Sequence, residues 1–216
     1  MCFSAGASFA GGALITAAGI LTIRKNSDPS RRVFASMPLV FGAQQISEGF
    51  VWVALQSPGH DLMLKIATYT FLFAAVILWP SFVPASVFLM EKLKRRRMII
   101  LPFLVVGILV SVYYGIGLLT REVTPMISSH HIRYASDIPK QWSLYVFAGY
   151  LLATLVPLFI SSRRQIWILG LLMTFSCLIT GIFYKEYLTS VWCFFAAVIS
   201  IVNYFIISAD TAGKET

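Results

Sequence analysis

The stretch Gln44-Gln45-Ile46-Ser47-Glu48-Gly49-Phe50-Val51-Trp52 places polar groups in the second long apolar segment of the chain. The residues on either side are apolar enough for a lipid bilayer, yet the stretch carries two amides and a carboxyl group. A charged side chain in the middle of a membrane costs about 2.5–3.5 kcal/mol on insertion scales, so such groups face a protein partner or a wet cavity. We therefore expect this stretch to lie inside a helical bundle and to mark a site.

The composition places the chain among membrane proteins. Of its 216 residues, 58% are hydrophobic and 12% are charged, whereas soluble domains carry about 25% charged residues. The net charge of +8 does not indicate a nucleic-acid partner, because the basic residues lie in short clusters between apolar runs, as topology signals do. The three cysteines form neither a disulfide framework nor a C-x-x-C metal pair.

Seven segments are long and apolar enough to cross a bilayer, which takes about 20 residues per helix. They cover residues 4–23, 33–55, 62–90, 98–119, 142–161, 166–184 and 187–208. The sequence therefore predicts an all-α, polytopic fold with one seven-transmembrane-helix bundle at residues 1–208 and a short cytoplasmic tail at residues 209–216. Within the third segment, Pro80 and Pro84 predict a kink or partial unwinding.

The basic residues predict the orientation of the bundle. Most of the 17 Lys and Arg residues lie in alternate loops, at residues 24–32, 91–97 and 162–165. Loops on the cytoplasmic side carry an excess of Lys and Arg. The N-terminus is therefore expected outside and the C-terminus in the cytoplasm, with the lipid bilayer as the partner. The longest loop, at residues 120–141, then lies outside.

When sequence positions are converted to depths along the helices, several polar residues fall in the outer half of the bundle. At a rise of 1.5 Å per residue, Glu48 lies ~8 Å below the outer boundary and Cys193 lies ~9 Å deep in the last helix. Residues three and four apart share one helix face, so the polar residues of the second helix form a single stripe. We interpret Glu48 as a catalytic or coupling residue, and we expect the binding residues to be Gln44, Gln45, Trp52, Tyr69 and Cys193. The alternative is structural: a neutral Glu48 hydrogen-bonded to another helix.

The long outer loop contains the adjacent pair His130 and His131. Neutral imidazole is the commonest metal ligand, so a transition metal such as zinc is the candidate cofactor. Adjacent histidines point in different directions on a regular element, and a solvated loop pair is the alternative. If the loop folds over the mouth of the bundle, it brings a histidine towards Glu48. Cys2 is expected at the same mouth, as a candidate nucleophile or ligand once Met1 is removed.

Several motifs resemble those of one family of small bacterial integral membrane proteins. The motifs are Met1-Cys2-Phe3-Ser4-Ala5, Gln44-Gln45 with Glu48-Gly49 and Val51-Trp52, His130-His131-Ile132 with Tyr134, and Trp192-Cys193 with Ala196-Ala197. That family is catalogued as a domain of unknown function. The resemblance implies that these positions belong to one pattern, and it implies a bacterial cytoplasmic membrane as the location.

These observations leave three functions open. The leading one is a membrane-embedded enzyme, metal- or thiol-dependent, that acts on a lipid or small amphiphile from the outer side. The second is a transporter or channel for a small solute, ion or proton in which Glu48 is the coupling carboxylate. The third is a seven-helix sensor that binds a ligand outside and a partner inside.

Overall fold

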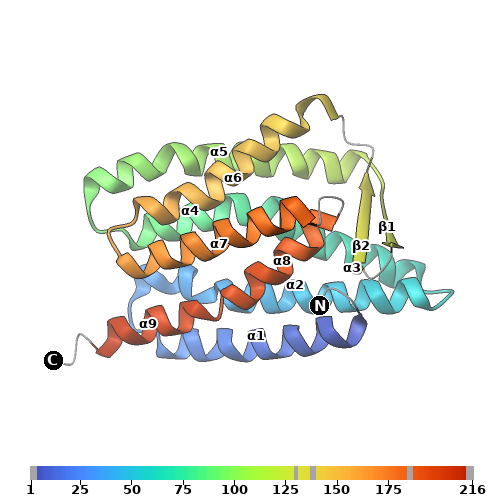
Figure 1. Ribbon diagram of the computed structural model, residues 1–216, viewed down its shortest axis with the longest axis horizontal. Coiled ribbons are helices and arrows are strands. Elements are labelled where there is room, and N and C mark those ends of the chain that lie inside the picture. Colours follow the sequence, from blue (N-terminus) through green and yellow to red (C-terminus); the bar gives the residue numbers. More distant parts are fainter. Residues whose placement is uncertain (1–3, 129–130, 137–139, 184–186, 213–216) are drawn as a thin grey trace.

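The computed structural model describes residues 4–128, 131–136, 140–183 and 187–212, which form long helices lying side by side along one axis (Figure 1). The helical elements are α1 (Ala5–Lys25), η1 (Pro29–Arg31), α2 (Arg32–Gln56), α3 (Asp61–Leu72), η2 (Phe73–Leu78), α4 (Trp79–Met90), α5 (Lys94–Thr120), α6 (Lys140–Ile160), α7 (Arg164–Phe183), α8 (Leu188–Ile199) and α9 (Val202–Ala212). Two strands, β1 (Val123–Ser128) and β2 (His131–Ser136), complete the fold.

Five helical segments are long and apolar enough to cross a membrane. They are Ala5–Lys25, Asp61–Met90, Lys94–Thr120, Arg164–Phe183 and Thr189–Ser208. The predicted multi-pass membrane class is therefore confirmed, whereas the predicted count of seven spans goes beyond these five. Of the other two long helices, α2 contains the polar stretch around Glu48, and the described apolar part of α6, Leu144–Ile160, is shorter.

The bundle has two chemically different ends (Figure 1). At one end, which we call the basic end, lie the α1–α2, α4–α5 and α6–α7 connections with their Lys and Arg residues. The β1–β2 hairpin and the α2–α3 connection lie at the opposite end, which we call the hairpin end. Because basic and non-basic connections alternate along the sequence, most Lys and Arg residues gather at one end of the bundle.

Helices α1 and α2 are antiparallel and pack so closely that glycine is needed at the contact. A Cβ atom on Gly19 would lie 2.8 Å from the Leu39 Cα, and one on Gly42 would lie 2.8 Å from the Thr16 backbone nitrogen. At the hairpin end, Gly49 leaves room for the ring of Phe9. Small residues allow such close backbone approach between membrane helices. These contacts fix the register of α1 against α2 along its whole length.

The kink predicted for the third segment takes the form of a π-helical turn, η2, placed just before Pro80. Proline lacks an N–H group, and its ring clashes with the carbonyl four residues earlier, which here belongs to Val76 within η2. The looser turn leaves carbonyl groups available to other helices. The Ser111 hydroxyl donates to the Ile77 oxygen at 2.6 Å, and the Tyr150 hydroxyl donates to the Ala75 oxygen at 2.8 Å.

The prediction of an all-α fold with a loop at residues 120–141 is wrong, because that loop contains the antiparallel β1–β2 hairpin. Ile132 is fully buried against the hairpin end of the bundle and clusters there with Val51, Trp52 and Ala67. The stretch around Ile127 and Ile132 carries β-branched residues that suit strands, although its polar residues suggested a loop. The fold is therefore mostly helical rather than all-α.

Two predicted boundaries also differ from the structure. Helix α5 begins at Lys94 and includes part of the basic cluster that the sequence assigned to a loop, because Lys and Arg are good helix formers. The last segment is divided into α8 and α9 at Ser200–Ile201. Helix α9 continues to Ala212, beyond the predicted end of the domain at residue 208.

A polar clasp at the basic end joins the α4–α5 connection to the α6–α7 connection. Glu91, only 3% exposed, accepts hydrogen bonds from the Leu93 N–H (3.0 Å), the Ser162 N–H (2.7 Å) and the Ser162 hydroxyl (2.9 Å). Arg96 Nη1 donates to the carbonyl oxygens of Ile160 and Ser161, both at 2.8 Å. Together these bonds satisfy backbone groups at the end of α6, where helices leave carbonyls unpaired.

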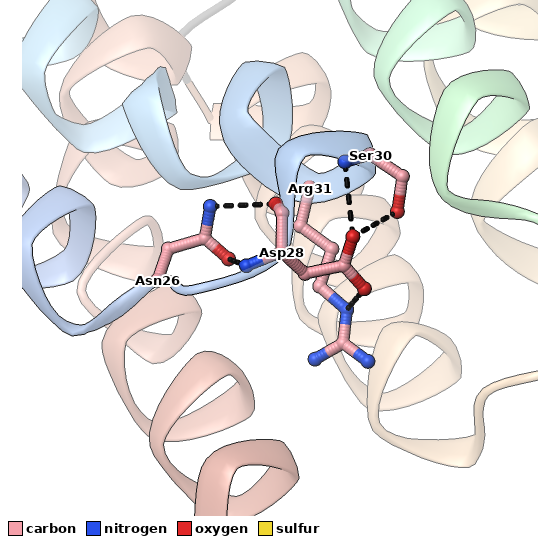
Figure 2. Close-up of polar contacts among 4 residues, drawn as sticks. All are labelled: Asn26, Asp28, Ser30 and Arg31. Carbon is pink, nitrogen blue, oxygen red and sulfur yellow. Dashed lines mark hydrogen bonds and ion pairs between the residues drawn. The ribbon is translucent and has the colours of Figure 1, made fainter.

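The α1–α2 connection is closed by Asp28 (Figure 2). Its Oδ1 accepts from the Ser30 N–H (3.0 Å) and the Ser30 hydroxyl (2.8 Å), and its Oδ2 lies 3.3 Å from Arg31 Nε. Asn26 braces the same turn through two bonds with the Asp28 backbone. The carboxylate therefore serves both as the cap of η1 and as a counter-charge for the buried Arg31.

Replacing Asp28 by alanine should lower the free energy of unfolding by about 2 kcal/mol, because the cap is lost and the buried Arg31 loses this counter-charge. Thermal unfolding of the detergent-purified protein measures the effect. Asp28→Asn is the matched variant, since its side-chain oxygen can still accept from the Ser30 N–H. We expect Asp28→Asn to fall between the wild type and Asp28→Ala; equal stability of all three would contradict this role of Asp28.

Candidate functional site

Glu48 occupies the centre of a buried polar layer inside the bundle. Its side chain is fully buried, and Oε1 accepts a hydrogen bond of 2.5 Å from the hydroxyl of Ser190, also fully buried, at the start of α8. The Cys193 thiol, one turn further along α8, lies within interaction range of the Gln44 amide and the Glu48 carboxyl. The contacts between α2 and α8 therefore include polar side chains in the half of α2 nearer the hairpin end.

Gln44 and Gln45 extend this layer on α2. Both are buried, and the Gln44 side-chain oxygen accepts a hydrogen bond of 2.7 Å from the indole N–H of Trp79 on α4. The Trp79 ring stacks on Phe41 with their centroids 3.8 Å apart, which fixes the indole in place. Neither side-chain polar atom of Gln45, in contrast, has a hydrogen-bond partner among the residues that the structure describes.

Further buried polar groups lie at the same level on α1 and α3. The α1–α2 register, in which Gly12 meets Ile46 and Phe9 meets Gly49, places Ser8 level with the turn that contains Glu48. On α3, Thr68 follows Ala67, which clusters with Val51 and Trp52 of α2. The hydroxyls of Ser8 and Thr68 and the indole N–H of Trp52 are buried without a hydrogen-bond partner within the described part of the chain. We call this set the polar layer; it comprises Ser8, Gln44, Gln45, Glu48, Trp52, Thr68, Ser190 and Cys193.

The polar layer is bordered by a groove on one side and a cavity on the other. Thr68 lines a groove of about 210 Å³ at the hairpin end, whose lining includes Asp61, Lys65 and Glu122; we call it the rim groove. Cys193 lines an internal cavity of about 40 Å³, counted as space that the centre of a water molecule can occupy. This interior cavity extends towards the basic end as far as Asn203. The layer therefore lies between two separate spaces.

The predicted site residues have different positions in the structure. The layer includes Gln44, Gln45, Glu48, Trp52 and Cys193. Tyr69 lines the rim groove, and its hydroxyl lies 3.5 Å from the Arg121 oxygen, so it belongs to the hairpin end. Their roles in binding or catalysis stay predictions.

The metal prediction rested on the two histidines and on Cys2. His131 is buried on β2, with its ring 4.8 Å from that of Tyr187, so the interpretation of a solvated loop is wrong for this residue. His130 and Cys2 lie outside the described residues. Over the part of the chain that the structure describes, no three His, Cys, Asp or Glu side chains come together as a metal site. Zinc bound at the histidines stays a prediction.

The sequence interpretation missed Ser190 and Trp79, the hydrogen-bond partners of Glu48 and Gln44. A signal for Ser190 was present, because it lies three residues before Cys193 and therefore on the same face of the last helix. Trp79 lies next to Pro80, in the segment for which the sequence predicts a kink, and nothing local marks it as a polar partner. Its role depends on the contact between α4 and α2, which no local pattern reveals.

Comparisons with known proteins identify a family for the chain but assign it no activity. No curated protein and no solved structure shows significant similarity to the chain. One family model matches it over residues 1–216, that is, over its full length. The chain therefore belongs to that family, a family of unknown function designated DUF6629.

Proposed function

We propose that the protein is a membrane carrier that binds a small solute, through hydrogen bonds, at the polar layer around Glu48. The observation that carries this proposal is the Gln45 amide, fully buried and without a hydrogen-bond partner among the described residues. Leaving a buried polar group unsatisfied costs about 1–3 kcal/mol, so native proteins rarely retain one without a reason. A solute with donors and acceptors would satisfy Gln45 together with the hydroxyl of Thr68.

The placement of the layer favours a carrier over a simple surface receptor. A carrier exposes one site inside the bundle alternately to the two sides of the membrane. The rim groove borders the layer on the side of the hairpin end, and the interior cavity borders it on the side of the basic end. The π-helical turn in η2 is a natural place for bending between these two spaces, since such turns often occur at functional sites.

The proposal includes seven membrane crossings, with the hairpin end outside and the basic end in the bacterial cytoplasm. In support, α2 has 25 residues and packs along the membrane-length helix α1, so both would cross the same thickness. The asymmetry of Lys and Arg between the two ends follows the positive-inside rule. Gln44, Gln45 and Glu48, which lower the hydropathy of α2, are buried inside the bundle.

A membrane-embedded enzyme is the second candidate, supported by the Ser190–Glu48 hydrogen bond and the neighbouring Cys193 thiol. A carboxylate within reach of a hydroxyl or thiol can act as a general base for a nucleophile. The substrate would then be a lipid or small amphiphile. A cysteine nucleophile needs the thiolate form, and forming that charge on a buried thiol beside the Glu48 carboxyl is unfavourable, so the carrier is the better interpretation.

Cysteine accessibility distinguishes the two candidates. A Gln45→Cys variant, in a background with Cys2, Cys177 and Cys193 changed to serine, should react with a membrane-impermeant thiol reagent added to either face of the membrane. The matched control is Ala17→Cys, an exposed position on α1 that faces lipid and should react from neither face. Reaction from both faces supports the carrier. Reaction from the hairpin face alone overturns the carrier in favour of the enzyme, and reaction from neither face overturns both.

A further inference from the structure

We infer that the interior cavity binds the short apolar tail of an amphiphilic ligand whose polar head lies at the polar layer. The inference rests on the proposed function for the head and names the substrate class. The cavity walls come from six helical elements and include Phe41 on α2, Val83 on α4, Leu158 on α6 and Leu169 on α7. Three polar residues, Thr154, Ser200 and Asn203, also line the cavity but expose almost no polar surface to it. Apolar cavities of this kind stay dry and bind apolar molecules rather than water.

The head and the tail of such a ligand would meet at Cys193 and Trp79. Cys193 lines the cavity and also interacts with Gln44 and Glu48 in the polar layer. Trp79 lines the same cavity while its indole N–H donates to Gln44. The indole N–H of Trp192, another lining residue, is buried without a hydrogen-bond partner in the described part of the chain and could donate to the head. The cavity therefore has a polar junction at the layer and apolar walls below it.

The volume of the cavity limits the tail to a few carbon atoms. It is about 40 Å³, whereas an engineered cavity of about 150 Å³ accommodates benzene. A second cavity of about 60 Å³ shares Tyr150, Trp192 and Cys193 with the first. The rings of Tyr150 and Trp192 meet edge to face with their centroids 5.6 Å apart and separate the two spaces. Tyr150 is held there by its hydrogen bond to Ala75 in η2, so movement of this ring would join the cavities.

Two methionines make the remaining walls adaptable. Met37 and Met173 line the cavity from α2 and α7. Methionine is unbranched and flexible, and it is common where a surface must fit several apolar shapes. The walls can therefore adjust to linear or branched tails. We expect the optimum to lie at about three to five carbon atoms, set by the two cavities together.

Tryptophan quenching by ω-bromoalkanols tests the inference, because bromine quenches an indole on contact and Trp79 and Trp192 both line the cavity. The probes run from bromoethanol to bromo-octanol, with the full-length protein in nanodiscs. Quenching should be saturable, and affinity should rise about fourfold per added methylene before levelling off near five carbons. Trp192→Phe should remove much of the signal. Trp167→Phe, at a lipid-facing position that is 48% exposed, should leave the saturable part unchanged.

A substitution that fills the cavity is compared with the same substitution at an exposed position. Ala196→Leu adds bulk to the cavity wall and should weaken the binding of bromobutanol at least tenfold, whereas Ala148→Leu on the exposed side of α6 should change it less than twofold. If Ala196→Leu does not fold, Leu169→Phe fills the cavity from α7. Quenching that does not saturate, or that is equal in the filled and control variants, overturns the inference.

The same probes separate this inference from the proposed function. Loss of cavity binding with two-sided labelling of Gln45→Cys intact overturns only the tail pocket. Cavity binding that persists while Gln45→Cys reacts from neither face overturns the carrier and retains the pocket.

Discussion

A Gly107→Ala variant should lose about 3 kcal/mol of stability and unfold about 6–12 °C below the wild type, because one added methyl group separates two helices. Gly107 lies on α5 where that helix crosses α4 at Pro80. A Cβ atom at this position would overlap the Pro80 carbonyl oxygen and lie 2.7 Å from its carbonyl carbon. Backbone atoms cannot rotate away as a flexible side chain can. Thermal unfolding followed by circular dichroism in detergent measures the shift.

The control for this prediction is Gly115→Ala, eight residues later on the same helix. A Cβ atom there would meet only the Ile77 Cδ1 atom, at 3.7 Å, an ordinary van der Waals distance. Because alanine favours a helix over glycine by about 1 kcal/mol, Gly115→Ala should be neutral or slightly stabilising. Equal melting temperatures for the two variants would show that α4 and α5 do not make this contact.

A Glu91→Gln variant should lose about 2–3 kcal/mol of stability at neutral pH, the second largest effect that we expect. Glu91 accepts three hydrogen bonds, two of them from Ser162, and a carboxylate accepts more strongly than a neutral group. Glutamine would place an N–H₂ group against one of these donors and leave it unsatisfied. The clasp between the α4–α5 and α6–α7 connections should therefore loosen at the basic end.

The pH dependence identifies the charge as the cause. Burial raises the pKa of Glu91, but hydrogen bonds from Leu93 and Ser162 and the charge of Arg96 outweigh it and hold the pKa below its ordinary value. A depressed pKa in the folded state stabilises the protein above the unfolded pKa, and this contribution is lost as pH falls through the folded value. Wild-type stability should therefore fall towards the variant's in the acid range, below about pH 4. The control is Glu122→Gln, which removes an exposed carboxyl group and should show neither effect. If the difference in unfolding free energy between Glu91→Gln and the wild type stays constant from neutral to acid pH, the charge of Glu91 is excluded as the cause.

Many residues of the candidate site can be predicted from the sequence because helical spacing is regular. The positions of Gln44, Gln45, Glu48 and Trp52 on α2 repeat at three and four residues, so a shared face follows from helix geometry alone. Counting depth places Cys193 near the same level, and it does lie within interaction range of Gln44 and Glu48. The hydrogen-bond partners of these polar groups cannot be predicted in this way, because Ser190 and Trp79 reach Glu48 and Gln44 only through packing between separate helices.

The membrane class, the positions of most long helices and the segregation of basic residues can be predicted from the chain alone, because they depend on local composition and on helix length. Three features appear only in the folded chain: residues 123–136 contain a hairpin at one end, a π-helical turn precedes Pro80, and two members of the polar layer, Thr68 and Cys193, line a groove and an apolar cavity. Each of these features depends on which elements touch in the folded chain. Cavities and buried hydrogen bonds arise from contacts between residues far apart in the chain, and such contacts leave no periodic signal in the sequence.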